Sequence, residues 1–248
     1  MSEMVSLTGI VLSCIPVAEY DNRIVILTSE RGKICAFAKG ARRMKNSLLG
    51  LTRPFLMARF DLYEGRDAYT LVGGETIEYF DELSKNIEIL HYGFYFLEIA
   101  DYYGREGIEA KDMLNLLYMS FKALIARKMS PALIKDVFEF KAMVLNGEYP
   151  ELFICNRCHK EKEMVIFSMS MGGLVCDCCP DVYDKVVLSK DTVYTLKYIV
   201  LAKLQKLYTF TLSDHVFEEF DRVMAILRKV NFDKHFKSLD LLETMMSL

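Results

Sequence analysis

The chain has 248 residues, of which 52% are hydrophobic and 26% are charged, a balance that supports a packed core and excludes an intrinsically disordered protein. No apolar stretch reaches the length of a membrane-spanning helix, and the N-terminus lacks the pattern of a secretion signal, so we expect a cytoplasmic protein. The formal net charge of -3 gives no support by itself for a nucleic-acid partner.

The positive charges are concentrated near the N-terminus. Residues 1–60 contain nine lysines and arginines but only four acidic residues, an excess of five positive charges. Such asymmetry favours one face for an anionic partner. The alternative is an uneven but fully solvated surface.

Residues 1–80 predict five short strands. Apolar residues alternate with polar or small ones, and the linkers at 29–32 and 64–67 have the polar and glycine chemistry of hairpin turns. Short strands joined by tight turns indicate a small barrel or sandwich. The basic segment 39–45 falls between the third and fourth strands and is therefore expected to be a loop. The expected strands cover residues 5–11, 23–28, 33–38, 55–63 and 68–72.

From about residue 83 the apolar spacing becomes helical, with hydrophobic residues recurring every three or four positions. Ser130 followed by Pro131 is a good helix start, and this helix is expected to end near Gly147. Ser189 can cap a helix through Leu207. Further helices are expected from Ser213 through Lys229 and after Ser238, and the apolar stripes of these helices, which include Phe94, Phe138, Tyr198 and Phe217, are expected to form the core.

Five of the seven cysteines fall within 25 residues, a clustering that indicates a metal site. Cys155 and Cys158 form one CxxC pair, and Cys176 and Cys179 form a second pair after 17 intervening residues. Each two-residue gap allows a tight turn that brings two thiolates to one ion. The spacing predicts one structural zinc held by these four residues.

Two alternatives stay open for these cysteines. Cys178 could replace Cys179 as the fourth ligand, although the single-residue gap of a CxC pair is less favourable for placing both thiolates on one ion. A redox dithiol is also compatible with a single CxxC pair. Four thiolates would leave zinc no open position for water, so we do not expect metal catalysis.

No motif of an enzyme family stands out, because GxGxxG, Walker, GxSxG and HExxH patterns are all absent from the sequence. The histidines are scattered, and acidic pairs such as Asp81-Glu82 are expected to lie on solvated helix faces. We therefore expect a binding protein. A metal-dependent nuclease would need clustered carboxylates, which the sequence does not suggest.

The order of these features resembles the RecO family of bacterial recombination mediators. The resemblance rests on the segments 8–12, 39–43 (KGARR), 53–55 (RPF), 138–150 and 236–239, and on the cysteine pairs with GGLVC before the second. It implies an α+β protein with a five-stranded OB-fold barrel over residues 1–80. An α-helical domain over residues 81–248 follows, with a zinc finger at about 150–183.

The resemblance also implies binding to single- and double-stranded DNA, annealing of complementary strands and association with the nucleoid. Its implied partners are RecR, the acidic, apolar tail of single-stranded DNA-binding protein and, indirectly, RecA. We expect phosphate contacts from five residues of the barrel and, for the tail, contacts from three residues of one helix. These are Lys39, Arg42, Arg43, Lys45 and Arg53 for DNA, and Lys135, Phe138 and Lys141 for the tail.

A zinc-ribbon transcription or translation accessory factor is the competing interpretation. It would place the nucleic-acid contact on the finger, through Arg157, Lys160 and Lys162. Aromatic residues of the barrel are candidates for base stacking, but a small barrel needs most of them in its core. These candidates are Phe37, Phe55, Phe60, Tyr63 and Tyr69.

Overall fold

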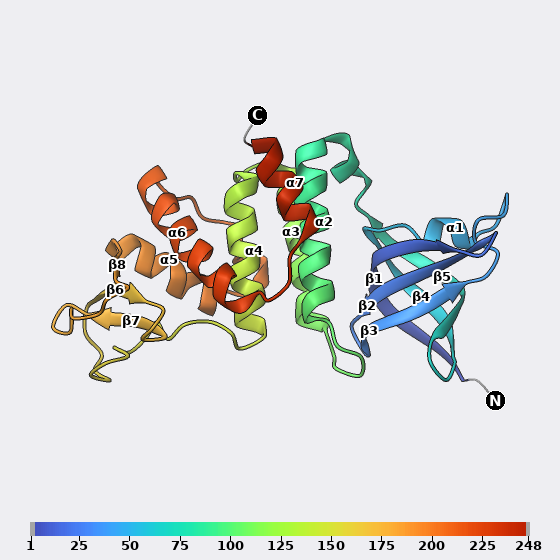
Figure 1. Ribbon diagram of the computed structural model, residues 1–248. Helices are drawn as coiled ribbons and strands as arrows, with labels where there is room; N and C mark the ends of the chain where they lie inside the picture. The colour runs from blue at the N-terminus through green and yellow to red at the C-terminus, as the bar shows by residue number, and fades with distance from the viewer. Residues whose placement is uncertain (1–2, 247–248) are drawn as a thin grey trace. The chain divides into compact units, whose positions relative to one another are not determined.

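The computed structural model describes residues 3–246, which fold as two compact units (Figure 1). Unit 1 contains the chain up to residue 125 together with the segment from Phe236, and unit 2 contains residues 126–235. Unit 2 is thus an insertion in unit 1. The first unit is α+β with strands preceding helices, as expected.

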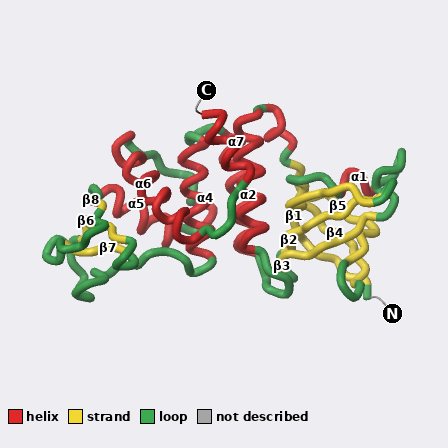
Figure 2. Tube along the Cα trace, in the orientation of Figure 1, coloured by secondary structure: helices red, strands yellow, loops and turns green. Residues whose placement is uncertain are grey.

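Five strands of unit 1 close into a barrel in the order β1-β2-β3-β5-β4, seen as the yellow strands beside β1 to β5 in Figure 2. The contact between β3 and β5 is parallel, and every other neighbouring pair is antiparallel. The short helix α1 (Leu48–Leu51) lies between β3 and β4 in the chain. The strands are β1 (Met4–Val17), β2 (Asp21–Thr28), β3 (Gly32–Ala38), β4 (Leu56–Glu64) and β5 (Tyr69–Tyr79).

Alternation of apolar and polar residues explains the barrel, because every second side chain points inward. Ile24 and Ile26 of β2, and Phe60 and Leu62 of β4, are completely buried. Gly9 permits the close pairing of β1 and β2, since a Cβ there would lie 2.5 Å from the Leu27 carbonyl oxygen. The barrel core therefore consists of packed apolar side chains.

The fifth strand is longer than predicted. The sequence pattern ends near residue 72, because Gly73 and Gly74 interrupt the alternation, yet β5 continues to Tyr79. Gly73 pairs with Asp61, and Gly74 pairs with Phe60 of β4. The strand continues beyond the glycines because its pairing with β4 uses backbone groups and needs no side chain.

The helices of unit 1 follow the barrel. Phe55, which precedes β4, packs against Phe94 and Phe121 with ring centroids 4.8 and 5.5 Å apart. The last helix of the chain packs against the first long helix, where Tyr95 and Phe236 meet edge to face at 5.5 Å. These elements are the 3-10 turn Asp81–Lys85, α2 (Ile87–Tyr103), α3 (Lys111–Ala126) and α7 (Lys237–Met246).

Unit 2 combines three packed helices with a small antiparallel sheet of order β7-β6-β8. Ser130, Ser189 and Ser213 each cap the N-terminus of a helix by accepting a backbone N–H, which confirms these predicted starts. The elements are α4 (Pro131–Leu145), β6 (Met164–Ser168), β7 (Gly173–Cys176), β8 (Val186–Val187), α5 (Lys190–Leu201), the 3-10 turn Leu204–Lys206, and α6 (Asp214–Asn231).

The helix after Ser189 is shorter than predicted. It ends at Leu201, and the Lys141 ammonium group accounts for the ending by donating to the carbonyl oxygens of Ile199, Val200 and Ala202, each at 2.9 Å. A cation at a helix C-terminus satisfies carbonyl groups that have no partner within the helix.

The barrel ends at Tyr79, next to the domain boundary expected at residue 80, whereas the compact units group α2 and α3 with the barrel. The division into domains 1–80 and 81–248 therefore stays a prediction. Among the described residues, no helix is long and apolar enough to span a bilayer.

Candidate functional site

The two CxxC pairs come together in unit 2. The Sγ atoms of Cys155, Cys158, Cys176 and Cys179 all lie within 4.8 Å of one another, and those of Cys158 and Cys176 are 3.8 Å apart. Cys155 and Cys158 belong to the loop before β6, whereas Cys176 ends β7 and Cys179 lies in the turn after it. The fold thus brings two cysteine pairs that are distant in the sequence together in one cluster.

Tight turns shape both halves of the cluster. The backbone N–H of His159 donates to the Cys155 carbonyl at 2.8 Å, and that of Cys179 donates to the Cys176 carbonyl at 3.0 Å. The left-handed backbone of His159, with φ of 56°, closes the first turn. The two halves are joined directly, because the Cys176 N–H donates to the Cys155 Sγ at 3.3 Å.

The donor set fits a zinc ion. Zinc bound to thiolates at about 2.3 Å in a tetrahedron requires sulfur atoms about 3.8 Å apart. The Cys158–Cys176 distance has this value, and the other separations lie within 4.8 Å. Cys155 and Cys176 are fully buried, so the cluster is shielded from solvent on one side.

The thiols influence one another's ionisation. Burial raises the pKa of Cys155, but backbone N–H groups of Cys176, Cys158 and Arg157 outweigh burial and bring that pKa to about 6. Burial and the neighbouring thiols raise the pKa of Cys176 to about 12, and burial raises the pKa of Cys179. Four thiolates this close repel one another unless a cation lies among them.

Cys178 lies outside the four-thiol cluster. Its side chain is exposed, and its Sγ accepts from the Lys162 ammonium group at 3.3 Å. Cys178 forms a separate, more exposed group with Cys176 and Asp177. His159 is also exposed. The geometry favours Cys179 over Cys178 as the fourth ligand.

The basic loop comprises residues 39–45 between β3 and β4. Its four basic residues are all exposed: Lys39, Arg42, Arg43 and Lys45. Among the described residues, no acidic side chain forms an ion pair with any of them. Gly40 and Lys45 adopt left-handed backbone conformations, with φ of 67° and 65°. The loop therefore presents four uncompensated cations to solvent.

Hydrogen bonds hold this loop in shape. The Gly40 N–H donates to the Asp21 carboxylate at 2.7 Å, and the Asn46 side chain donates to the Gly40 carbonyl at 2.8 Å. The Arg42 N–H donates to the Tyr20 carbonyl at 2.9 Å, and the Arg43 guanidinium lies 5.1 Å from the Tyr20 ring centroid. The loop is consequently pre-organised by the turn between β1 and β2.

The other barrel residues that are candidates for DNA contact differ in how far they are exposed to solvent. Arg53 is exposed, and among the described residues no acidic side chain forms an ion pair with it. Phe55, Phe60 and Tyr69 are buried, whereas Phe37 and Tyr63 are 36% and 41% exposed. Most aromatic candidates thus belong to the core, and two remain accessible for stacking.

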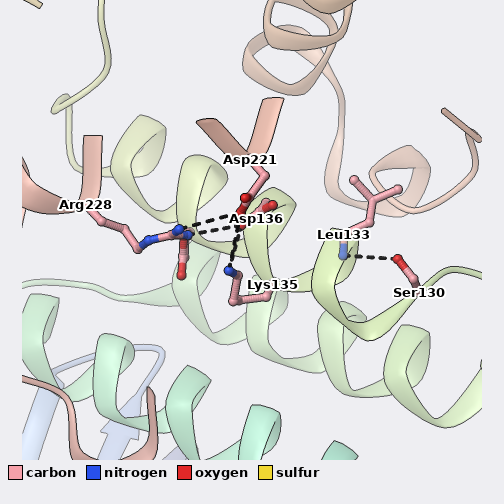
Figure 3. Close-up of polar contacts among 7 residues, drawn as sticks. Ser130, Leu133, Lys135, Asp136, Asp221 and Arg228 are labelled. Carbon is pink, nitrogen blue, oxygen red and sulfur yellow. Dashed lines mark hydrogen bonds and ion pairs between the residues drawn. The ribbon is translucent and has the colours of Figure 1, made fainter. Parts of the chain in front are cut away.

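The three residues expected to contact a partner tail lie on α4 but do not form an exposed surface. Phe138 is completely buried, as its place in an apolar stripe predicts, and Lys141 is buried against the end of α5. Lys135 has a side chain 13% exposed, paired with the Asp136 carboxylate at 3.0 Å (Figure 3). This burial argues against peptide docking at Phe138 and Lys141.

Next to Lys135 lies a buried charge cluster that sequence reasoning missed. The Arg228 guanidinium of α6 lies 3.1 Å from Asp136 and 3.6 Å from Asp221 (Figure 3). It also lies 2.7 Å from the Glu139 carboxylate. Asp136 and Glu139 have no solvent exposure. The Asp136 Oδ2 atom is buried without a hydrogen-bond partner among the described residues. Burial, aided by the negative charges of Glu139 and Asp221, raises the pKa of Asp136 to about 7 despite Lys135 and Arg228.

We expect Asp136→Asn to remove a pH dependence of stability. Because the folded-state pKa of Asp136 is raised to about 7, the folded protein holds a proton that the unfolded chain has already lost. This group therefore makes the free energy of unfolding fall as pH rises from about 4 to about 7. Thermal unfolding at several pH values measures the slope, with Glu218→Gln, which changes an exposed carboxylate on α6 outside the charge cluster, as the control. An unchanged slope in Asp136→Asn would show that Asp136 is ionised throughout.

The protein thus combines a closed barrel that carries exposed basic residues with a four-thiol cluster that could hold a metal ion. Comparison with known families shows which class of protein has these two parts. The family model described as Recombination protein O N terminal matches residues 1–80, and that described as Recombination protein O C terminal matches residues 84–240. The chain belongs to the RecO family of DNA repair and recombination proteins.

Individual relatives match along almost the whole chain. The DNA repair protein RecO of Acetivibrio thermocellus is 31% identical over 241 residues, which cover 96% of each chain. That of Thermoanaerobacter sp. is 28% identical over 241 residues and 97% of each chain. That of Alkaliphilus metalliredigens is 29% identical over 241 residues, 96% of this chain and 98% of its own. These matches favour DNA repair over a transcription or translation accessory function.

Proposed function

We propose that this protein is a non-enzymatic recombination mediator that binds single- and double-stranded DNA and anneals complementary strands. The observation that carries the proposal is the exposed basic loop 39–45, pre-organised on a closed barrel in a chain of the RecO family. Lysine and arginine side chains that contact phosphate release counterions, which drives association without sequence preference.

The barrel is proposed to be an OB-fold. Its five strands close through a parallel contact between β3 and β5, and its only helix, α1, lies between β3 and β4. OB barrels hold single strands against a positively charged surface with accessible aromatic rings. In this barrel Lys39, Arg42, Arg43, Lys45 and Arg53 provide the charge, and Phe37 and Tyr63 are the expected candidates that remain accessible.

The four-thiol cluster is proposed to hold one structural zinc through Cys155, Cys158, Cys176 and Cys179. Its support is the proximity of the four sulfur atoms, which all lie within 4.8 Å of one another, and the mutual repulsion of four thiolates. When bound, zinc supplies cross-linking energy that fixes two loops and the end of β7 together. Four protein ligands leave no position for a reacting water, so the site is proposed to be structural.

The proposed partners are RecR, with which the protein assists the loading of RecA, and the tail of single-stranded DNA-binding protein. Support comes from family membership. Of the three residues expected to contact the tail, only Lys135 retains side-chain exposure. Calorimetry with the tail peptide tests the partner, and an annealing assay on strands coated with single-stranded DNA-binding protein tests the activity.

Changing Arg42 and Arg43 together to alanine is expected to weaken DNA binding and reduce its salt dependence. Each phosphate contact contributes about 0.7 to 0.9 to the slope of log affinity against log salt, so the slope should flatten by roughly one to two units. The fold should persist, because both side chains are exposed. Fluorescence anisotropy across a salt series measures both quantities.

The matched comparison is a finger variant in which Arg157, Lys160 and Lys162, all exposed, become alanine. The proposal expects this variant to retain most of the affinity and slope. If the loop variant binds like the parent protein and the finger variant does not, DNA binds the finger and the barrel assignment is wrong. Cleavage of the labelled DNA on addition of divalent metal would contradict a non-enzymatic role.

A further inference from the structure

A second feature of the barrel lies beside the short helix α1. An open cavity of about 440 Å³ is lined by Ser47 and Gly50 next to and within α1, by Arg53, and by Gly73, Thr76 and Tyr79 of β5. Its size falls within the range of small-ligand clefts, roughly 300–1,000 Å³. All of these residues belong to unit 1.

Two of the residues that line the cavity, Gly50 and Gly73, have no side chain. A Cβ atom built on Gly50 would meet no atom within 4 Å, and one built on Gly73 would meet only the Asp61 Oδ2 atom at 3.7 Å. Neither glycine has a positive φ, so the backbone itself does not require glycine at these positions. Each position therefore has room for a larger side chain, and glycine at both leaves backbone in the cavity wall.

The lining combines one cation, hydroxyl groups and an accessible ring. Arg53 has no acidic ion-pair partner among the described residues, and Tyr79 at the end of β5 is 39% exposed. Ser47 and Thr76 can donate and accept hydrogen bonds. None of the residues that line the cavity is acidic, although the Asp61 carboxylate lies 3.7 Å from the position that a Cβ atom of Gly73 would take. A flat ring and an unpaired arginine that line one cavity match a base attached to a phosphate.

We propose that this cavity binds one nucleotide of a single-stranded DNA, with the base against Tyr79 and its phosphate on Arg53. The proposal rests on the proposed function and deepens it. Ser47 follows Lys45 by two residues, so the chain leads directly from the basic loop to the cavity. A base in a duplex is stacked and paired, whereas a base in a single strand can enter without that cost.

The test compares three substitutions in the full-length protein by fluorescence anisotropy. Gly50→Leu fills open space at a helical position, and Tyr79→Ala removes the ring. Each should weaken binding of a single-stranded oligothymidylate about tenfold and leave binding to a duplex within about twofold of the parent. Arg53→Ala should weaken binding both to this oligonucleotide and to an abasic strand of the same length, because it removes a phosphate contact.

The controls separate the cavity from general electrostatics and from misfolding. Tyr79→Phe keeps the ring and should bind like the parent protein. Arg66→Ala removes another exposed barrel arginine, in the turn between β4 and β5, and should affect single strands and duplexes equally. Circular dichroism checks the fold of each variant. Abasic strands should bind Tyr79→Ala as they bind the parent protein.

The failures are distinguishable. A parent protein that does not bind DNA contradicts the proposed function itself. If the parent binds but Gly50→Leu and Tyr79→Ala resemble Arg66→Ala, the cavity is not a base site. Equal losses with normal and abasic strands in Tyr79→Ala would also overturn base binding. Free thymidine monophosphate should bind much more weakly than the oligonucleotide, and equal affinity would assign the cavity to a free nucleotide instead of a strand.

Discussion

Replacing Cys179 with serine is expected to abolish stoichiometric zinc binding and unfold the segment of about residues 150–183. The segment has two short strands and no helix, so metal-binding energy should contribute much of its folding energy, on the order of 10 kcal/mol in comparable small units. Metal analysis measures the zinc content. Limited proteolysis measures the exposure of the segment, and chelation of the parent protein should give the same cleavage pattern.

Cys178→Ser is the matched control, because the two cysteines are adjacent and only Cys179 belongs to the four-thiol cluster. The exposed thiol of Cys178 contacts Lys162, so removing this thiol should leave the zinc content at about one equivalent and the proteolysis pattern unchanged. The reverse ranking of the two variants would show that Cys178 is the fourth ligand. Purified parent protein without zinc would contradict the metal centre altogether.

Arg228→Met should lower the free energy of unfolding by about 3–5 kcal/mol, because it leaves the carboxyl groups of Asp136 and Glu139 buried without this partner. For a chain of this size the melting temperature should fall by roughly 10 °C. Thermal denaturation followed by circular dichroism measures the change. The double variant that combines Asp136→Asn with Arg228→Met should recover part of the lost stability, because it removes one of the two buried carboxyl groups that have lost Arg228 as a partner.

Arg222→Met provides the control for this prediction. Arg222 lies on the same helix, α6, but is exposed, so its replacement should change stability by less than about 0.5 kcal/mol. Equal effects of Arg222→Met and Arg228→Met would mean that the buried cluster contributes little. DNA binding of Arg228→Met, measured below its melting temperature, should equal that of the parent, because the proposed DNA contacts are in the barrel.

The features that the sequence predicted well depend on local patterns. The CxxC spacing predicts the four-thiol cluster because each pair closes its own turn, and the serine caps predict the starts of α4, α5 and α6 because capping involves only neighbouring residues. The five strands follow from local alternation of apolar residues. The zinc itself and the DNA contacts of the basic loop stay predictions.

The features that the sequence did not predict depend on contacts between distant residues. Arg228 and Asp136 are 92 positions apart, and no local pattern indicates that they meet. Lys141 is expected to contact the partner tail, yet it is buried, because α5 and α6 both pack against α4. The cavity beside Arg53 was not predicted, because its lining joins residues in and around α1 with residues of β5 that are distant in the sequence.

The discontinuity of unit 1 has a consequence for the order of folding during synthesis. Helix α2 is made early, but its partner α7 is translated only after all of unit 2. Until then the face of α2 that later meets Phe236 stays uncovered, and Glu98 lacks the backbone N–H of Ser238, 3.3 Å away in the folded protein. The barrel and unit 2 consist mainly of contacts within one continuous segment and can form first. The docking of α7 closes a loop of more than a hundred residues, so it should be the last step and the slowest to recover after unfolding.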